Sequence, residues 1–175
     1  MGFFIKKINE EKALDFFIWA YTKILSEEEM ERNKDKLRKL KEAFPLLKDV
    51  NQESFDENLT AVNIELLQAA WAKYYFSKGI GIIDAVQFNK KVDSEIESRF
   101  PLYKKLNGLI YSYNRAFASL NMEELFVSEI MGNSYKIAYE QQPEKIKEIL
   151  ANVSYMFAGT LDLAKQTIKE HKILS

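Results

Sequence analysis

The chain of 175 residues contains no cysteine and a single histidine, His171. The absence of cysteine excludes disulfides, thiolate nucleophiles, and zinc or iron–sulfur sites built on thiolates. One imidazole is also too few for a His-based metal site or for the paired Glu-x-x-His motifs of di-metal bundles. Because His171 stands near the end of the sequence, between Glu170 and Lys172, we expect an exposed residue rather than a general base. The sequence therefore predicts no metal site, no cofactor and no catalytic residue.

Glycine and proline are also scarce, with six and three copies, and two of the glycines stand close together in the stretch KYYFSKGIGIIDAVQF at 73–88. A dinucleotide-binding fingerprint needs a third glycine where Asp84 stands, and a Walker-type phosphate loop needs Gly-Lys-Ser/Thr, which the chain lacks. We therefore expect no phosphate-binding loop here. The prediction is that Gly79 ends one helix in a left-handed cap and that Asp84 caps the next helix.

Charge of one sign does not predominate, because 25 basic and 26 acidic residues give a formal net charge of −1. The chain thus lacks the global field that draws proteins to nucleic acids or anionic lipids. No apolar run reaches the roughly 18 residues that a membrane-spanning helix requires. The segment 1–17 has neither the apolar region nor the cleavage site of a signal peptide. We expect a cytoplasmic protein without a membrane span.

What the chain does have is abundant apolar material, with 47% hydrophobic and 13% aromatic residues. Its length and composition predict one domain that covers residues 1–175. Helix-capping pairs recur before apolar periodic segments: Ser26 with Glu29, Ser54 with Glu57, and Asn121 with Glu124. Pro101 and Pro143 suit the first position of a helix, where no amide hydrogen is needed.

These signals predict an all-α fold, a single-domain bundle of six to seven helices. The expected helices lie at 10–25, 27–43, 55–78, 84–99, 101–120, 122–141 and 143–171. The helix 55–78 carries two apolar stripes, so we expect it at the centre, with Trp71 buried and the helix 143–171 packed against it. The helix 27–43 has one narrow apolar stripe and should lie on the surface. Its exposed face should form the ion pairs Glu28 with Arg32 and Asp35 with Lys39.

A candidate partner-binding face lies on the helix 101–120, where polar and aromatic residues repeat at intervals of four. Its residues are Tyr103, Asn107, Tyr111 and Arg115. A separate core stripe is expected from Leu102, Leu106, Leu109, Tyr113, Phe117 and Leu120. Tyrosine and arginine are enriched at protein contact surfaces, so the first face is a candidate surface for a partner protein or a second copy of this chain. The alternative is that these tyrosines are half-buried core residues with solvated hydroxyls.

The function predicted from these features is non-enzymatic protein–protein binding, as an adaptor, inhibitor or regulatory subunit. A second hypothesis is a small-molecule sensor or enzyme with an aromatic-walled pocket around Trp71, Tyr74, Tyr75 and Tyr111. A third, which the charge balance does not favour, is nucleic-acid binding through a local basic patch of Lys90, Lys91, Arg99, Lys104 and Lys105. A cavity with convergent polar groups would favour the second hypothesis, and a basic groove the third.

Overall fold

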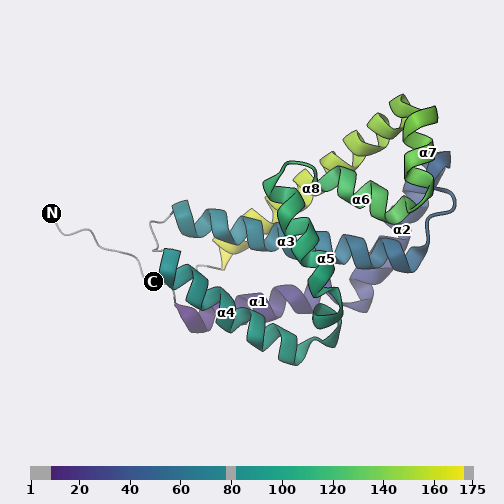
Figure 1. The fold of residues 1–175 in the computed structure, drawn as a ribbon. Coiled ribbons are helices and arrows are strands. Elements are labelled where there is room, and N and C mark those ends of the chain that lie inside the picture. Colours follow the sequence, from purple (N-terminus) through teal and green to yellow (C-terminus); the bar gives the residue numbers. More distant parts are fainter. Residues whose placement is uncertain (1–8, 78–81, 172–175) are drawn as a thin grey trace.

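The computed structural model describes residues 9–77 and 82–171 of the protein. Within these ranges the chain forms eight α-helices and one short 3-10 turn, with no strand (Figure 1). The elements are α1 (Glu10–Ile24), α2 (Glu27–Ala43), η1 (Pro45–Leu47), α3 (Gln52–Ser77), α4 (Ile82–Arg99), α5 (Pro101–Ala118), α6 (Met122–Met131), α7 (Ser134–Gln141) and α8 (Pro143–Glu170). The all-α prediction is confirmed, whereas the predicted number of helices is too low. That residues 1–175 form one domain stays a prediction.

Several helix ends follow directly from local hydrogen bonding. The Ser26 hydroxyl accepts a bond of 3.2 Å from the Glu29 amide at the start of α2, as the capping pair predicts. Pro101 and Pro143 occupy the first positions of α5 and α8, also as predicted. On α2 the expected ion pairs form, each at 2.6 Å: Arg32 with Glu28, and Lys39 with Asp35.

Three predicted caps differ from the structure. Helix α3 begins at Gln52, and the side chain of Asn51 accepts a 3.2 Å bond from the Ser54 amide, so Ser54 is not the cap. Asn121 stands at the N-cap position of α6 but makes no side-chain capping bond. Helix α4 begins at Ile82, which places Asp84 inside the first turn rather than before it. The cap predicted at Gly79 lies outside the described residues.

The helix predicted at 122–141 is two helices, because Gly132 interrupts it. Gly132 has φ 55° and ψ −133°, a conformation that residues with a Cβ rarely adopt. Its amide still bonds the Ser128 carbonyl at 2.8 Å and so closes α6. The chain then turns, and α7 begins at Ser134. The prediction of one continuous helix was wrong because a glycine within apolar periodicity also fits a packed helix interior.

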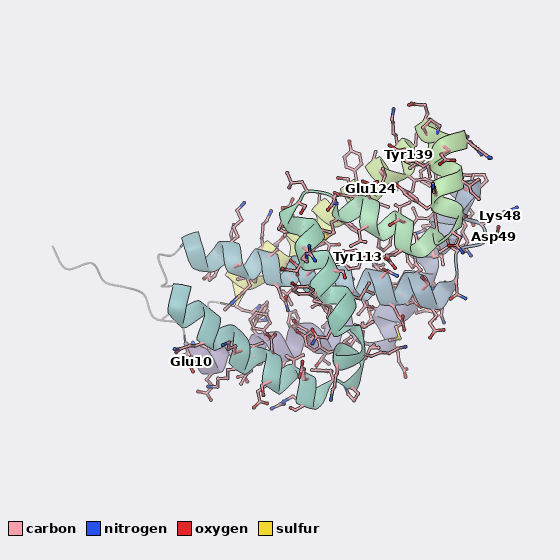
Figure 2. All side chains as sticks on the ribbon, viewed as in Figure 1. Glu10, Lys48, Asp49, Tyr113, Glu124 and Tyr139 are labelled. Carbon is pink, nitrogen blue, oxygen red and sulfur yellow. The ribbon has the colours of Figure 1, made fainter. Side chains whose placement is uncertain are left out.

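Helix α3 is the central element, as predicted. It packs against α1, α2, α5, α6 and α8, and the C-terminal part of α8 passes behind it in the view of Figure 1. All ten residues from Asn58 to Leu67 are buried, so this stretch has no solvent-facing side. Its buried polar residues therefore need partners within the protein. Asn58, for example, accepts a 2.6 Å bond from the hydroxyl of Tyr113, near the middle of the molecule (Figure 2).

None of the helices in the described part of the chain combines the length and apolar composition needed to cross a bilayer. The aromatic residues Phe16 and Phe17 of α1 pack instead into the core, beside Trp71 of α3. Trp71 is buried as predicted. These aromatic contacts join α1 to the C-terminal half of α3 and form one wall of the candidate site.

Candidate ligand-binding cavity

The four residues of the predicted partner-binding face do not share one surface. Tyr103 is only 3% exposed and lies in the core, whereas Asn107, Tyr111 and Arg115 are exposed. The reason is the core stripe of α5, which is Tyr103, Leu106, Ile110, Tyr113 and Ala116. The alternative of half-buried tyrosines with solvated hydroxyls fits neither residue, because Tyr103 is buried with its hydroxyl bonded to Gln68 and Asp93, and Tyr111 is exposed.

The predicted core stripe of α5 is correct in part. Leu106 and Tyr113 are buried, and the residues Leu102, Leu109 and Phe117 are partly buried. Leu120 is 92% exposed, because α5 ends at Ala118 and Leu120 has a positive φ of 57° in the turn that follows.

The aromatic pocket predicted around Trp71, Tyr74, Tyr75 and Tyr111 does not form as a unit. Tyr111 is 63% exposed and the side chain of Tyr75 lies outside the described part of the structure. Trp71 does line a cavity, but with other partners.

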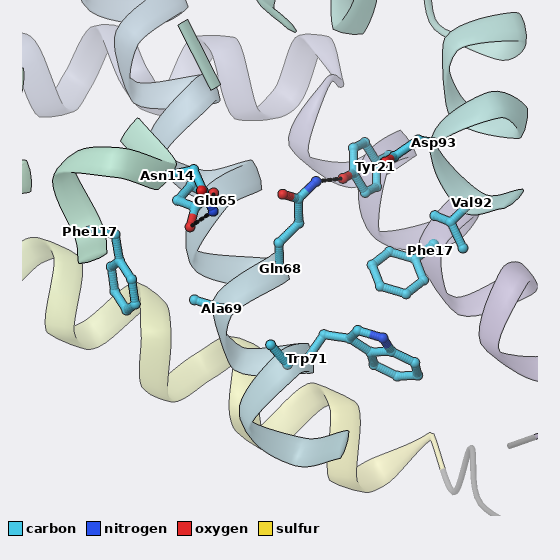
Figure 3. A pocket seen from close by; sticks show the side chains of 11 residues that line it. Phe17, Tyr21, Glu65, Gln68, Ala69, Trp71, Val92, Asp93, Asn114 and Phe117 are labelled. Carbon is cyan, nitrogen blue, oxygen red and sulfur yellow. Dashed lines mark hydrogen bonds between the residues drawn. The ribbon is translucent and has the colours of Figure 1, made fainter. Parts of the chain in front are cut away.

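That cavity lies between α1, α3, α4 and α5 and has a volume of about 320 Å³ (Figure 3). Its lining residues are Phe17, Tyr21, Glu65, Gln68, Ala69, Trp71, Ala72, Val92, Asp93, Asn114 and Phe117. Asn114 is exposed, so the cavity reaches the surface beside α5, whereas Tyr21, Glu65 and Trp71 are buried. The volume falls at the small end of the range of roughly 300 to 1,000 Å³ for ligand pockets.

Hydrogen bonds connect the polar residues at one end of the cavity. The Gln68 side-chain amide donates to the Tyr21 hydroxyl at 3.0 Å and, more weakly, to the Tyr103 hydroxyl at 3.5 Å. Tyr103 in turn donates to the Asp93 carboxylate at 3.2 Å. Burial raises the pKa of both tyrosines, so each hydroxyl keeps its proton. Burial also raises the pKa of Asp93, although the Tyr103 bond opposes this effect.

Glu65 lies on the other side of Gln68 and is nearly inaccessible, at 1% exposure. Both of its carboxylate oxygens accept from one donor group, the Asn114 amide nitrogen, at 3.1 and 3.3 Å. Removal from water disfavours the charged form and raises the pKa of Glu65 to about 7, more than the Asn114 bond lowers it. Glu65 can therefore exchange a proton near neutral pH.

The cavity has a polar side and an apolar side. Figure 3 shows Asn114, Glu65, the Gln68 amide, Tyr21 and Asp93 in a row across the view. Below this row in the same view lie the apolar residues, from Phe117 at the left through Ala69 to Trp71, Phe17 and Val92 at the right. The described lining contains two carboxyl groups and no lysine, arginine or histidine. Such a cavity can hold a molecule that is apolar along one edge and donates hydrogen bonds along the other.

A second, larger hollow of about 620 Å³ lies between α1, α2, α3 and α8. Its apolar wall includes Trp19 and Leu163, which are 43% and 64% exposed. Four of the charged residues that line it form ion pairs with one another: Arg32 with Glu28 and Glu29, and Lys36 with Glu29. This hollow offers no buried charge to orient a ligand.

The basic residues of the third hypothesis are largely paired with acids. The observed ion pairs are Lys91 with Glu10, Arg99 with Glu95, and Lys105 with Glu57. These pairs lower the positive charge that the sequence suggests for this region. Among the described residues, no three of the types His, Cys, Asp and Glu lie close enough to share a metal ion.

His171 is exposed, as predicted, and its ring contacts Phe16 and Trp19 with centroid distances of 5.0 and 4.9 Å.

Comparison of the chain with protein-family models, curated proteins and solved structures finds no similar protein. The geometry of the cavity must therefore support any functional proposal by itself.

Sequence reasoning missed Glu65 and Asp93, the two charged residues of the cavity. A signal for Glu65 was present, because it stands in the stretch TAVNIELLQAAW, which is apolar on both faces of a helix. A carboxyl group that no solvent-facing side can accommodate must be buried. Asp93 gives no comparable signal, since α4 carries many exposed charged residues.

Proposed function

We propose that the protein binds a small organic molecule in the cavity between α1, α3, α4 and α5, as a sensor or carrier. The observation that carries this proposal is the buried carboxyl group of Glu65 beside a cavity of ligand size. A carboxylate in a core costs stability unless it is well paired, and Glu65 has one amide donor for two oxygens. A bound ligand would supply the missing hydrogen bonds.

Binding is favoured over catalysis by the chemistry of the described lining. The cavity presents carboxyl, amide and phenol groups, without the serine, histidine or lysine that would form a nucleophile and base pair. Polar groups along one side and hydrocarbon along the other are instead typical of sites that orient a ligand.

The proposal is tested by screening a small-molecule library for compounds that raise the melting temperature of the protein. Each such compound is then measured on a variant whose cavity is filled by a larger side chain. Ala69 lines the cavity and is only partly buried, so Ala69→Phe should occupy the space while the fold is kept. The matched control is Ala151→Phe, at an exposed position of α8 that lines neither hollow. We expect hits that stabilise the wild type and the control but not Ala69→Phe.

Two results would contradict this proposal. One is a screen without any stabilising ligand. The other is a set of ligands that bind Ala69→Phe as tightly as the wild type, which would place their site elsewhere. Melts of the unliganded variants show whether each variant is folded before its binding is compared.

Protein–protein binding is the second candidate, supported by the exposed part of the predicted face on α5. Tyr111 is 63% exposed, and Asn107 and Arg115 lie one turn away on either side. Such tyrosine and arginine residues are frequent anchors of interfaces.

The double variant Tyr111→Ala with Arg115→Ala tests the second candidate. It should weaken association with a partner, or with a second copy, by at least about 2 kcal/mol. Because both residues are exposed, the melting temperature should stay close to that of the wild type. Pull-down and sedimentation measure the association, and unchanged association would show that this face is only solvated.

A further inference from the structure

We infer that the ligand of the cavity is an organic cation, a protonated primary amine whose ammonium group pairs with Glu65. This inference rests on the proposed function and names the chemical class of ligand. Three features of the cavity support it: the sign of its charge, the unused acceptors of Glu65 and the separation of polar from apolar walls.

The charge of the cavity favours a cation. Its described lining carries Glu65 and Asp93 and contains no lysine, arginine or histidine. An anionic ligand would bring a third carboxylate or a phosphate into a partly buried space, where like charges repel strongly. An ammonium group would offset the charge that Glu65 carries when ionised.

The hydrogen bonds of Glu65 favour a group with several donors. An ionised carboxylate has about four acceptor positions, and within the described structure Asn114 is its hydrogen-bond donor. An ammonium group brings three donors and no acceptor, so two of its hydrogens can bond the acceptor positions that Asn114 leaves free, and the third can bond water. A hydroxyl group brings only one donor.

The apolar wall fits the remainder of such a ligand. Phe17, Trp71 and Phe117 line the cavity and lie below the polar row in the view of Figure 3. The Trp71 ring already stacks with Phe16 and with Tyr74, at centroid distances of 6.1 Å each. Trp71 therefore contributes a rigid aromatic face, suited to a small aromatic or branched alkyl group.

Pairing with Glu65 makes the binding of an amine depend on pH, because Glu65 must lose its proton first. The pKa of Glu65 is about 7 in the free protein, and only its ionised form attracts an ammonium group. The ionised fraction rises about tenfold between pH 6 and pH 8, so the affinity for an amine should rise about tenfold as well. In the described part of the chain, the other titratable groups that line the cavity are Asp93 from α4 and Tyr21 from α1; Tyr103 from α5 bonds Asp93, and Glu97 lies one turn along α4. Both tyrosines keep their protons in this range.

The experiment compares three probes of nearly the same shape by calorimetry: phenethylamine, 2-phenylethanol and phenylacetate. For the wild type at pH 8 we expect the amine to bind at least tenfold more tightly than the alcohol, and the carboxylate most weakly. At pH 6 the amine should bind about tenfold more weakly than at pH 8 and should release a proton on binding. The alcohol should show neither effect.

Glu65→Gln tests the named residue. It should lose the preference for the amine and the pH dependence, yet still bind the alcohol. The matched control is Glu53→Gln, which removes an exposed carboxyl group from the same helix, twelve residues from Glu65 and outside the cavity. The control should bind the amine like the wild type.

The possible outcomes separate the two proposals. If the alcohol or the carboxylate binds the wild type as tightly as the amine, the inference is wrong and cavity binding stands. The inference is also wrong, and cavity binding still stands, if none of the three probes binds but uncharged ligands from the thermal-shift screen bind the wild type and not Ala69→Phe. If no ligand depends on the cavity at all, the proposed function fails and the inference fails with it. The comparison of the three probes on the wild type tests the amine inference even if Glu65→Gln does not fold.

Discussion

At the scale of the residue, Glu65 stands out because it is the one charged residue that is buried in the described part of the protein. Its carboxyl group lies on the central helix and is removed from water, and its hydrogen-bond donor is a single amide. Each property raises the cost of ionisation. The same residue is therefore a source of instability in the free protein and a ready acceptor for a ligand.

The pH dependence of stability should reveal this cost. The pKa of Glu65 is raised from 4.5 to about 7 by folding, so the unfolded chain ionises first and stability falls as pH rises from about 4.5 through 7. Glu65→Gln removes this penalty. At pH 8 the variant should be more stable than the wild type by about 1 to 3 kcal/mol, and at pH 4 the two should be nearly equal. Urea unfolding at both pH values measures the difference, and a gap independent of pH would contradict the assignment.

At the scale of the element, the two glycines Gly132 and Gly159 play opposite roles. Gly132 ends α6 with a positive φ, whereas Gly159 lies inside α8, where an added Cβ would meet no neighbour. A side chain at Gly132 strains the backbone although space is open. A side chain at Gly159 reduces the entropy of the unfolded chain and suits a helix.

Gly132→Ala should therefore destabilise the protein by about 1 to 2 kcal/mol, and Gly159→Ala should stabilise it by about 0.5 to 1 kcal/mol. The two variants add the same methyl group at exposed positions, so each is the control for the other. Chemical unfolding measures both. A stabilising Gly132→Ala would mean that α6 and α7 can form one helix, as the sequence pattern suggests.

Helices could be located from the sequence because caps and prolines act locally. Ser26, Pro101 and Pro143 stand where their chemistry requires, and the first residues of their helices were predicted correctly. Which face of a helix is buried depends less on local sequence. On α5 both Leu102 and Tyr103 begin plausible stripes, and the choice of Tyr103 as a core residue depends on partners in α1, α3 and α4.

The cavity could not be predicted for the same reason. Its lining comes from four helices, and residues far apart in the sequence, such as Tyr21 and Asp93, meet only through tertiary packing. A local pattern indicates that Glu65 is buried, but does not show that Asn114 and a cavity lie beside it.

At the scale of the whole molecule, the central helix couples the other elements. Helix α3 contacts five helices, and its aromatic and aliphatic residues belong to one continuous set of buried side chains from α1 to α8. A shared core of this kind unfolds as a unit.

We therefore expect one cooperative unfolding transition, the test of the predicted single domain over residues 1–175. Circular dichroism should follow the helices, and fluorescence should follow Trp19 and Trp71, which report on α1 and α3. The two midpoints should coincide. Separate midpoints would show that part of the chain unfolds independently.

The central claim, that a small molecule binds between α1, α3, α4 and α5, is tested most directly by fluorine NMR of the protein labelled with fluorotryptophan. The chain has two tryptophans, and each lines a different hollow: Trp71 the cavity beside Glu65, and Trp19 the hollow beside α2 and α8. Trp19→Phe assigns the two signals. Titration with a ligand from the thermal-shift screen that stabilises the wild type but not Ala69→Phe should shift the Trp71 signal saturably and leave the Trp19 signal nearly unchanged. A saturable shift of Trp19 alone, or of neither signal, would contradict the account.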